Sequence, residues 1–144
     1  MVEVEKIFTE TPTQAVPQFA LTEKEGNPKR VVLLIEGEII GDADGDKEAK
    51  EHGAELMLHA LSSLEKAKVV PDEIILLHDG VKLLLRENEC FICWKAILDR
   101  EIVVKACNET LFYLGKIPED PRILCEDMED LLQDLLTADQ VVRL

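Results

Sequence analysis

The thiol of Cys107 lies between an apolar run, residues 102–106, and a helix-like stretch, residues 108–113. A helix that begins there would direct free backbone N–H groups and a partial positive charge at the sulfur, and both favour the nucleophilic thiolate. Lys105 precedes Cys107 by two residues, so its ammonium should face the same side of a strand, where it either favours the thiolate or is simply solvated. The alternative is that Cys107 is a small buried hydrophobic residue at a strand end.

Cys90 and Cys93 form a C-x-x-C pair, and their spacing places both thiols on one face of a helix. The apolar neighbours Phe91, Ile92 and Trp94 favour packing in the core. A redox pair and half of a metal site are the alternatives. A zinc or iron–sulfur site built from all four cysteines would need a second close pair, which the sequence lacks, so we predict no metal and no cofactor.

The acidic loop at residues 41–46 resembles the beginning of a calcium-binding loop. Counted from Asp42, however, the sixth position is Lys47 and the twelfth is Gly53, so the EF-hand pattern fails. We expect a solvated loop whose Asp46 caps the next helix, with a role in partner docking left open.

Strands and helices alternate along the chain. The predicted strands cover Arg30–Ile35, Glu73–Leu77, Glu101–Ala106, Arg122–Cys125 and Gln140–Leu144, and the predicted helices cover Glu48–Ala67, Glu89–Leu98, Asn108–Leu114 and Glu126–Leu136, with a helical turn at Val81–Leu85. This alternation predicts an α/β fold in which helices cover both faces of a parallel sheet. Residues 1–29, rich in proline and polar side chains, form an N-terminal arm with a short strand at Val2–Phe8, and residues 30–144 form the domain.

Sites in parallel sheets lie beyond the carboxyl ends of the strands. That edge should collect His78 and Gly80 after the second strand, Cys107 and Asn108 after the third, and Cys125 at the end of the fourth. His78 is either a proton donor or acceptor near Cys107 or a histidine satisfied at a strand end.

Composition excludes several classes of function. The 144 residues carry a net charge of −14, which argues against binding nucleic acid or anionic membranes; a basic protein partner is the sharper alternative to a solvated acidic surface. No apolar run spans a bilayer, the acidic N-terminus does not read as a signal peptide, and the cysteines suit a reducing compartment, so we expect a cytoplasmic protein.

Three stretches carry a resemblance to a known family: residues 41–61, residues 71–83 (PDEIILLHDGVKL) and residues 103–115 (VVKACNETLFYLG). They resemble the DsrE, DsrF, TusD and YchN group of sulfurtransferase-like proteins, and most closely the C-terminal domain of YedF-like selenium-metabolism proteins. The most specific match comprises Pro71, Ile74, Gly80, Val81, Lys82 and Leu83. His78 stands where the family usually has asparagine, and Thr110 stands where YedF-like relatives have a second cysteine.

The resemblance implies a three-layer α/β/α sandwich with a largely parallel five-stranded sheet, and assembly into trimers or hexamers. It also implies that Cys107 carries persulfide sulfur between donor and acceptor proteins, with His78, Lys105, Asn108, Cys125 and Gly80 as supporting residues. With Thr110 in place of a second cysteine, the thiol partner would come from another molecule or from Cys125. The alternatives are a non-catalytic oligomeric binding or scaffold subunit, which a sealed and unreactive Cys107 would favour, and a redox or metal protein using Cys90 and Cys93.

Overall fold

The computed structural model describes residues 29–144. The predicted N-terminal arm, with its strand at Val2–Phe8, therefore lies outside the described residues except for Lys29. Within the described part of the chain, no helix is long and apolar enough to cross a bilayer.

Five strands form one sheet in the order β4-β3-β2-β1-β5, and every neighbouring pair is parallel. The strands are β1 (Val31–Ile35), β2 (Glu73–Leu76), β3 (Val103–Cys107), β4 (Leu124–Glu126) and β5 (Gln140–Arg143). The sheet is thus wholly parallel, where the sequence predicted a largely parallel one. All five carboxyl ends meet at one edge.

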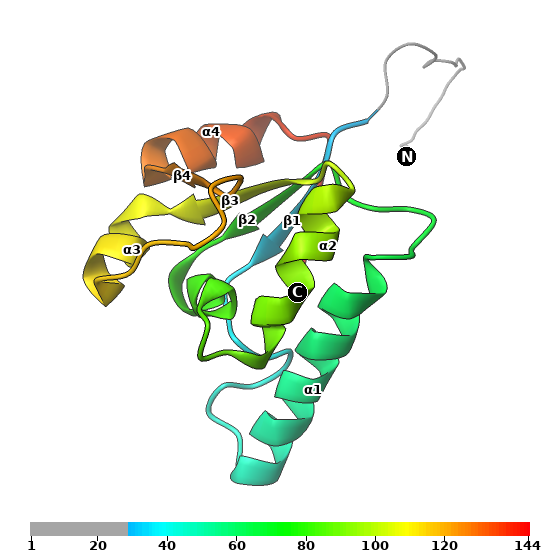
Figure 1. Ribbon diagram of the computed structural model, residues 1–144, viewed down its shortest axis with the longest axis vertical. Helices are drawn as coiled ribbons and strands as arrows, with labels where there is room; N and C mark the ends of the chain where they lie inside the picture. The colour runs from blue at the N-terminus through cyan, green and yellow to red at the C-terminus, as the bar shows by residue number, and fades with distance from the viewer. Residues whose placement is uncertain (1–28) are drawn as a thin grey trace.

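The helices form layers on both sides of this sheet (Figure 1). They are α1 (Lys47–Ser63), α2 (Trp94–Asp99), α3 (Asn108–Leu114) and α4 (Met128–Thr137), with 3₁₀ segments η2 (His78–Leu84) and η3 (Glu89–Cys93). In Figure 1, α4 covers one face, α1 and α2 cover the other, and α3 lies beyond the end of β3. The predicted three-layer α/β/α sandwich is confirmed.

Hydrophobic patterning explains the layers. The runs in β1 and β2 are apolar on both faces, and almost all of their side chains are buried, as expected for interior parallel strands. The amphipathic helix α1 buries Gly53, Met57 and Leu61. Its N-cap is Asp46, whose carboxylate accepts the N–H of Ala49 at 2.8 Å. The capping role predicted for the acidic loop is confirmed.

One predicted helix, Glu89–Leu98, is wrong as a single element, because it divides into η3 and α2. Asn88 caps the first 3₁₀ turn by accepting the N–H of Cys90 at 2.8 Å. Trp94 is buried and its Nε1 donates to the carbonyl of Leu83 at 2.9 Å. These local bonds favour a tight turn before the α-helix begins, and tight turns of this kind are common at helix termini. The first helix is also shorter than predicted and ends at Ser63 rather than Ala67.

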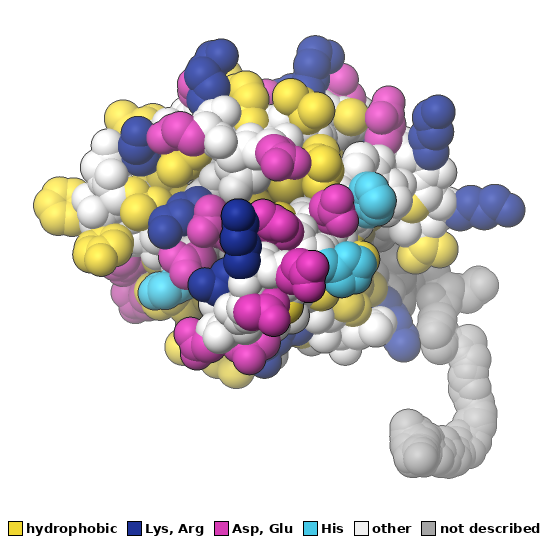
Figure 2. Space-filling model, turned by 90° about the horizontal axis from the view of Figure 1, so that it is seen from below, with side chains coloured by type: hydrophobic (Ala, Val, Ile, Leu, Met, Phe, Trp, Pro, Cys, Tyr) yellow, Lys and Arg dark blue, Asp and Glu magenta, His cyan; other side chains and the backbone are white. Residues whose placement is uncertain are grey.

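Acidic side chains cover much of the surface. Figure 2 shows them in the middle of the face seen from below, interspersed with fewer basic ones, while hydrophobic side chains gather on the side where α3 lies. This distribution agrees with the net charge of −14.

Gly80 permits a close contact between the chain after β2 and the end of β1. A Cβ at this position would lie 2.2 Å from the carbonyl oxygen of Ile35, a backbone atom that cannot move aside. The N–H of Leu77 donates to this same oxygen at 3.0 Å. The absence of a side chain at Gly80 therefore lets η2 pack directly on the carboxyl edge of the sheet.

We predict that Gly80→Ala lowers the free energy of unfolding by about 3 kcal/mol, because the added methyl group overpacks this contact. The matched control is Gly37→Ala, where the nearest atom to the added Cβ is 3.5 Å away. Urea unfolding of both variants measures the difference. Equal stability of the two variants would contradict the close contact.

Candidate functional site

Cys107 is the last residue of β3 and directly precedes α3, the position predicted for it. Its side chain is only 4% exposed. The sulfur donates a hydrogen bond to Oε1 of Glu109 at 3.4 Å. In this arrangement Cys107 holds its proton against a carboxylate and is covered from solvent.

Glu109 also joins α3 to α4. The same oxygen, Oε1, accepts the backbone N–H of Met128, the first residue of α4, at 2.9 Å. In the opposite direction, Nδ2 of Asn108 donates to Oδ1 of Asp127 at 3.0 Å. Asp127 is the N-cap residue of α4 but makes no capping bond with its own side chain. Glu109 therefore caps α4 from the neighbouring helix; we call these two contacts the helix clasp.

The carboxylate of Glu109 stays ionised at neutral pH. Its pKa is lowered by hydrogen bonds from its own backbone N–H, from the N–H of Met128 and from the thiol of Cys107. Asn108, which the resemblance implies as a supporting residue, makes two contacts of its own. It contacts Asp127 and, at 3.5 Å, the carbonyl of Cys125, and so orients the start of α3.

We predict that Glu109→Ala increases the rate at which iodoacetamide modifies native Cys107 several-fold. The substitution removes an acceptor shared by the thiol and the start of α4, and loss of a helix cap costs about 1 kcal/mol. Peptide mapping by mass spectrometry gives the rate at each cysteine. Glu129→Ala, in the exposed first turn of α4, is the control and should leave the rate unchanged. An unchanged rate in Glu109→Ala would show that the clasp does not cover Cys107.

Lys105 faces the same side of the sheet as Cys107, as predicted, but its ammonium is engaged by carboxylates. Nζ lies 3.3 Å from Oε1 of Glu126 and 3.6 Å from Oε2 of Glu73, and it also donates to Oδ2 of Asp134. Arg30 contributes a second positive charge, 3.3 Å from Oε1 of Glu73. These five residues form a charged cluster between the sheet and α4.

The residues of the charged cluster shift one another's pKa values. Burial lowers the pKa of Lys105, but the hydrogen bond to Asp134 and the surrounding negative charges outweigh burial and raise it, so Lys105 remains a cation. Glu73 is the one buried charged residue within residues 29–144, at 7% exposure. Burial first, and then a hydrogen bond with Asp134, raise the pKa of Glu73 to about 7. The same hydrogen bond lowers the pKa of Asp134, so the proton resides on Glu73.

The raised pKa of Glu73 makes stability depend on pH. Below pH 4.5 the carboxyl of Glu73 is protonated in both the folded and the unfolded state. Between pH 4.5 and about 7 it ionises only in the unfolded chain, so the free energy of unfolding falls as the pH rises.

We predict that Glu73→Gln removes this fall in the free energy of unfolding. The free energy of unfolding of the variant, relative to that of the natural chain, should therefore be larger at pH 8 than at pH 5. Urea unfolding at the two pH values measures it. Glu65→Gln, an exposed carboxyl, is the control and should leave the pH dependence as it is. Parallel pH profiles for the natural chain and Glu73→Gln would contradict the protonated state of Glu73.

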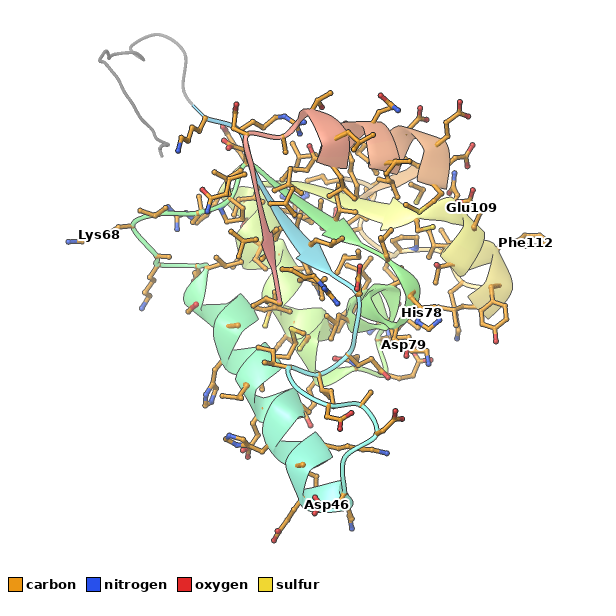
Figure 3. The ribbon with its side chains drawn as sticks, turned by 180° about the vertical axis from the view of Figure 1, so that it is seen from behind. Asp46, Lys68, His78, Asp79, Glu109 and Phe112 are labelled. Atoms are coloured by element: carbon orange, nitrogen blue, oxygen red, sulfur yellow. The ribbon has the colours of Figure 1, made fainter. Side chains whose placement is uncertain are left out.

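His78 and Gly80 lie at the carboxyl edge, after β2. His78 has a positive φ of 50° and an exposed side chain with Nδ1 3.7 Å from Oδ2 of Asp79. The left-handed conformation suits the asparagine that the resembled family has here. In Figure 3, His78 and Asp79 lie below the end of β2, while Glu109 lies on α3. Gly80 acts by close packing rather than by chemistry.

Cys125 and Cys107 lie on opposite faces of the sheet. In the parallel pair of β3 and β4, Cys125 lies opposite Ala106 and Glu126 lies opposite Cys107. Because Ala106 and Cys107 point to opposite faces of the sheet, the thiol of Cys125 points to the face opposite that of Cys107. Cys125 is the exposed thiol of the four, and partial burial raises its pKa. The structure therefore brings Cys107, Asn108 and Glu109 together, and it places the thiol of Cys125 on the other face of the sheet although the Cys125 carbonyl contacts Asn108.

Cys90 and Cys93 are buried in the core, where the sequence favoured them. Desolvation is the main cause that raises the pKa of both thiols, to about 11 for Cys90. A redox nucleophile needs the opposite shift. No group of three His, Cys, Asp or Glu side chains within residues 29–144 is arranged to hold a metal ion.

Sequence reasoning missed Glu109, Asp127, Glu73 and Asp134. Glu73 carried a signal, because a carboxylate that begins an apolar strand is expected to have a partner. Glu109 carried a weaker signal, since it is an acid in the first turn of a helix, where an acid also suits the helix dipole. Its contact with α4 depends on tertiary structure.

The fold is shared with solved structures. YchN from E. coli matches with a TM-score of 0.60 and 17% identity, over 81% of this chain and 100% of that one. A protein of unknown function from Methanobacterium thermoautotrophicum matches with a TM-score of 0.55 and 18% identity, over 81% of this chain and 100% of that one. A conserved protein of unknown function from Bacteroides thetaiotaomicron matches with a TM-score of 0.52 and 16% identity, over 78% and 94%.

These likenesses show that the chain has the YchN fold, the fold that the resemblance implied. No protein-family model matches the chain, and no curated protein sequence matches it.

Proposed function

We propose that this chain is a sulfur carrier in which Cys107 accepts persulfide sulfur and passes it to a partner thiol. The supporting observation is the placement of Cys107 at the carboxyl end of β3, ahead of α3 and within the helix clasp. Parallel sheets bind and react at this edge. The YchN fold and the sequence resemblance add to this support, since the resembled family carries sulfur on the corresponding cysteine.

The proposed step is an exchange between a thiol and a persulfide. The sulfur of Cys107 attacks the outer sulfur of a donor R–S–SH, the S–S bond of the donor breaks, and a new S–S bond forms on Cys107. The products are Cys107–S–SH and the donor thiol R–SH, which takes up the proton that Cys107 released. A second exchange moves the outer sulfur to an acceptor thiol and restores Cys107–SH.

Access to Cys107 is the controlled step in this proposal. The thiol is covered and holds its proton against Glu109, so the clasp must open before the exchange. Opening would separate Glu109 from Met128 and leave Cys107 at the edge of the sheet. Sealing the resting thiol would limit its contact with solvent oxidants to the periods when the clasp is open.

The proposal extends to partners and assembly. A cytoplasmic donor protein and an acceptor protein exchange sulfur with Cys107, and copies of the chain assemble as a trimer or hexamer, with the YedF-like subgroup as the nearest kin. Phe112 is 90% exposed and points away from the body of the molecule on α3, the helix that follows Cys107 (Figure 3). An exposed aromatic side chain on the helix that follows the thiol suits contact with another protein.

A second candidate is a non-catalytic oligomeric binding or scaffold subunit. The burial of Cys107, at 4% exposure, favours it. In that case Cys107 is a packing residue of the core at the end of β3, and the molecule functions only by binding other molecules at its surface.

Incubation with a small persulfide donor, followed by intact mass measurement, separates the two candidates. We predict that the natural chain gains one sulfur atom, that Cys125→Ser gains it equally, and that Cys107→Ser does not. Cys125→Ser is the matched control because it removes the exposed thiol and leaves Cys107 in place. Gain of sulfur on Cys125 alone would overturn the carrier proposal and favour the binding subunit.

A further inference from the structure

The outer edge of β5 is free of any strand within residues 29–144. The N–H groups of Gln140 and Leu144 donate to β1, at the carbonyls of Arg30 and Leu34. Alternate residues of a strand direct their N–H and C=O groups to opposite sides. The backbone groups of Val141 and Arg143 therefore point away from β1, along a sheet edge that can accept another strand.

An apolar groove of about 370 Å³ lies beside this edge, on the α1 face of the sheet. Its floor is formed by Val31 and Leu33 of β1 and by Val142 and Leu144 at the end of the chain. The loop after α1 forms one side of the groove through Val69, which is 87% exposed. Helix α1 thus leaves part of the apolar surface of β1 and β5 uncovered.

The chain itself holds a segment that suits this edge. Residues 1–28 precede the described part and join it beside Val31, which lines the groove. In a strand, residues 2–8 would place Val2, Val4, Lys6 and Phe8 on one side and Glu3, Glu5 and Ile7 on the other, so three of the four side chains on the first side are apolar. Residues 9–28 are long enough to reach either end of β5, at roughly 3.3 Å per residue.

The charge of Arg143, and the face of the sheet on which it lies, suit residues 2–8 as the strand that pairs with this edge. Arg143 projects on the face opposite the groove, because it alternates with the groove residue Val142. It lies 3.2 Å from Glu36 and remains 70% exposed. A strand that turns Val2, Val4 and Phe8 toward the groove turns Lys6 the same way, and it turns Glu3, Glu5 and Ile7 toward the face of Arg143.

We propose that residues 2–8 bind as a sixth strand along the outer edge of β5. Their apolar side chains cover the groove, and Glu3 or Glu5 pairs with Arg143. The proposal is independent of the reaction at Cys107, since the groove lies at β1 and β5 and the thiol lies at the end of β3. It gives the N-terminal arm a structural role, which is to close an exposed sheet edge against aggregation.

Amide hydrogen exchange in the full chain, followed by NMR, tests the proposal. We expect the N–H groups of Val141 and Arg143 to exchange about tenfold or more slowly than they do in Val4→Glu, because hydrogen-bonded amides exchange only on local opening. Thr13→Glu, the same charge placed outside the strand segment, is the control and should keep the protection of the natural chain. Both substituted positions lie outside residues 29–144.

Fast exchange of both amides in the natural chain would overturn the proposal. Protection that survives Val4→Glu and grows with protein concentration would also overturn it, because the edge would then be paired with a second copy.

Discussion

The interior strands of this protein are buried on both faces, so they must satisfy their backbone groups by pairing with neighbouring strands, and every such pair here is parallel. This requirement brings all five carboxyl ends to one edge and makes helices necessary on both sides. Gly80 belongs to the same constraint, because the chain leaving β2 must pack against the last carbonyl of β1. The reactive thiol, the histidine and the helix clasp lie at this edge because the sheet ends there.

The second organising feature is electrostatic. Lys105, Glu126 and Asp134 place charges, and Glu73 places a carboxyl group, between the sheet and α4, a region that apolar side chains could have filled. Buried ion pairs add little net stability, but they constrain geometry, because a buried charge that loses its partner destabilises the folded state strongly. The cluster fixes α4 on the sheet through Asp134, and the start of α4 then meets Glu109. Coverage of Cys107 therefore depends on how α4 is seated, although the two groups lie at different ends of this helix.

The sequence supported the prediction of the layers, the parallel sheet and the position of Cys107, because these follow from hydrophobic runs and local capping. Asn108–Leu114 was predicted with its observed bounds, since Gly115 ends it in the left-handed conformation that glycine adopts readily. The division of residues 89–99 into η3 and α2 was not predictable, since it depends on contacts with Leu83. The bond from Glu109 to Met128 joins residues of separate helices, and no local pattern encodes it.

The central claim is that Cys107 is a carrier whose sulfur moves on to another thiol. A single-turnover transfer measurement tests it most directly: the chain is loaded with radiolabelled persulfide sulfur, freed of donor, and mixed with an acceptor thiol. The account predicts that the label leaves Cys107 for the acceptor in a one-to-one amount and that the free thiol of Cys107 returns. Label that stays on the chain, or that leaves from Cys125 alone, would contradict it.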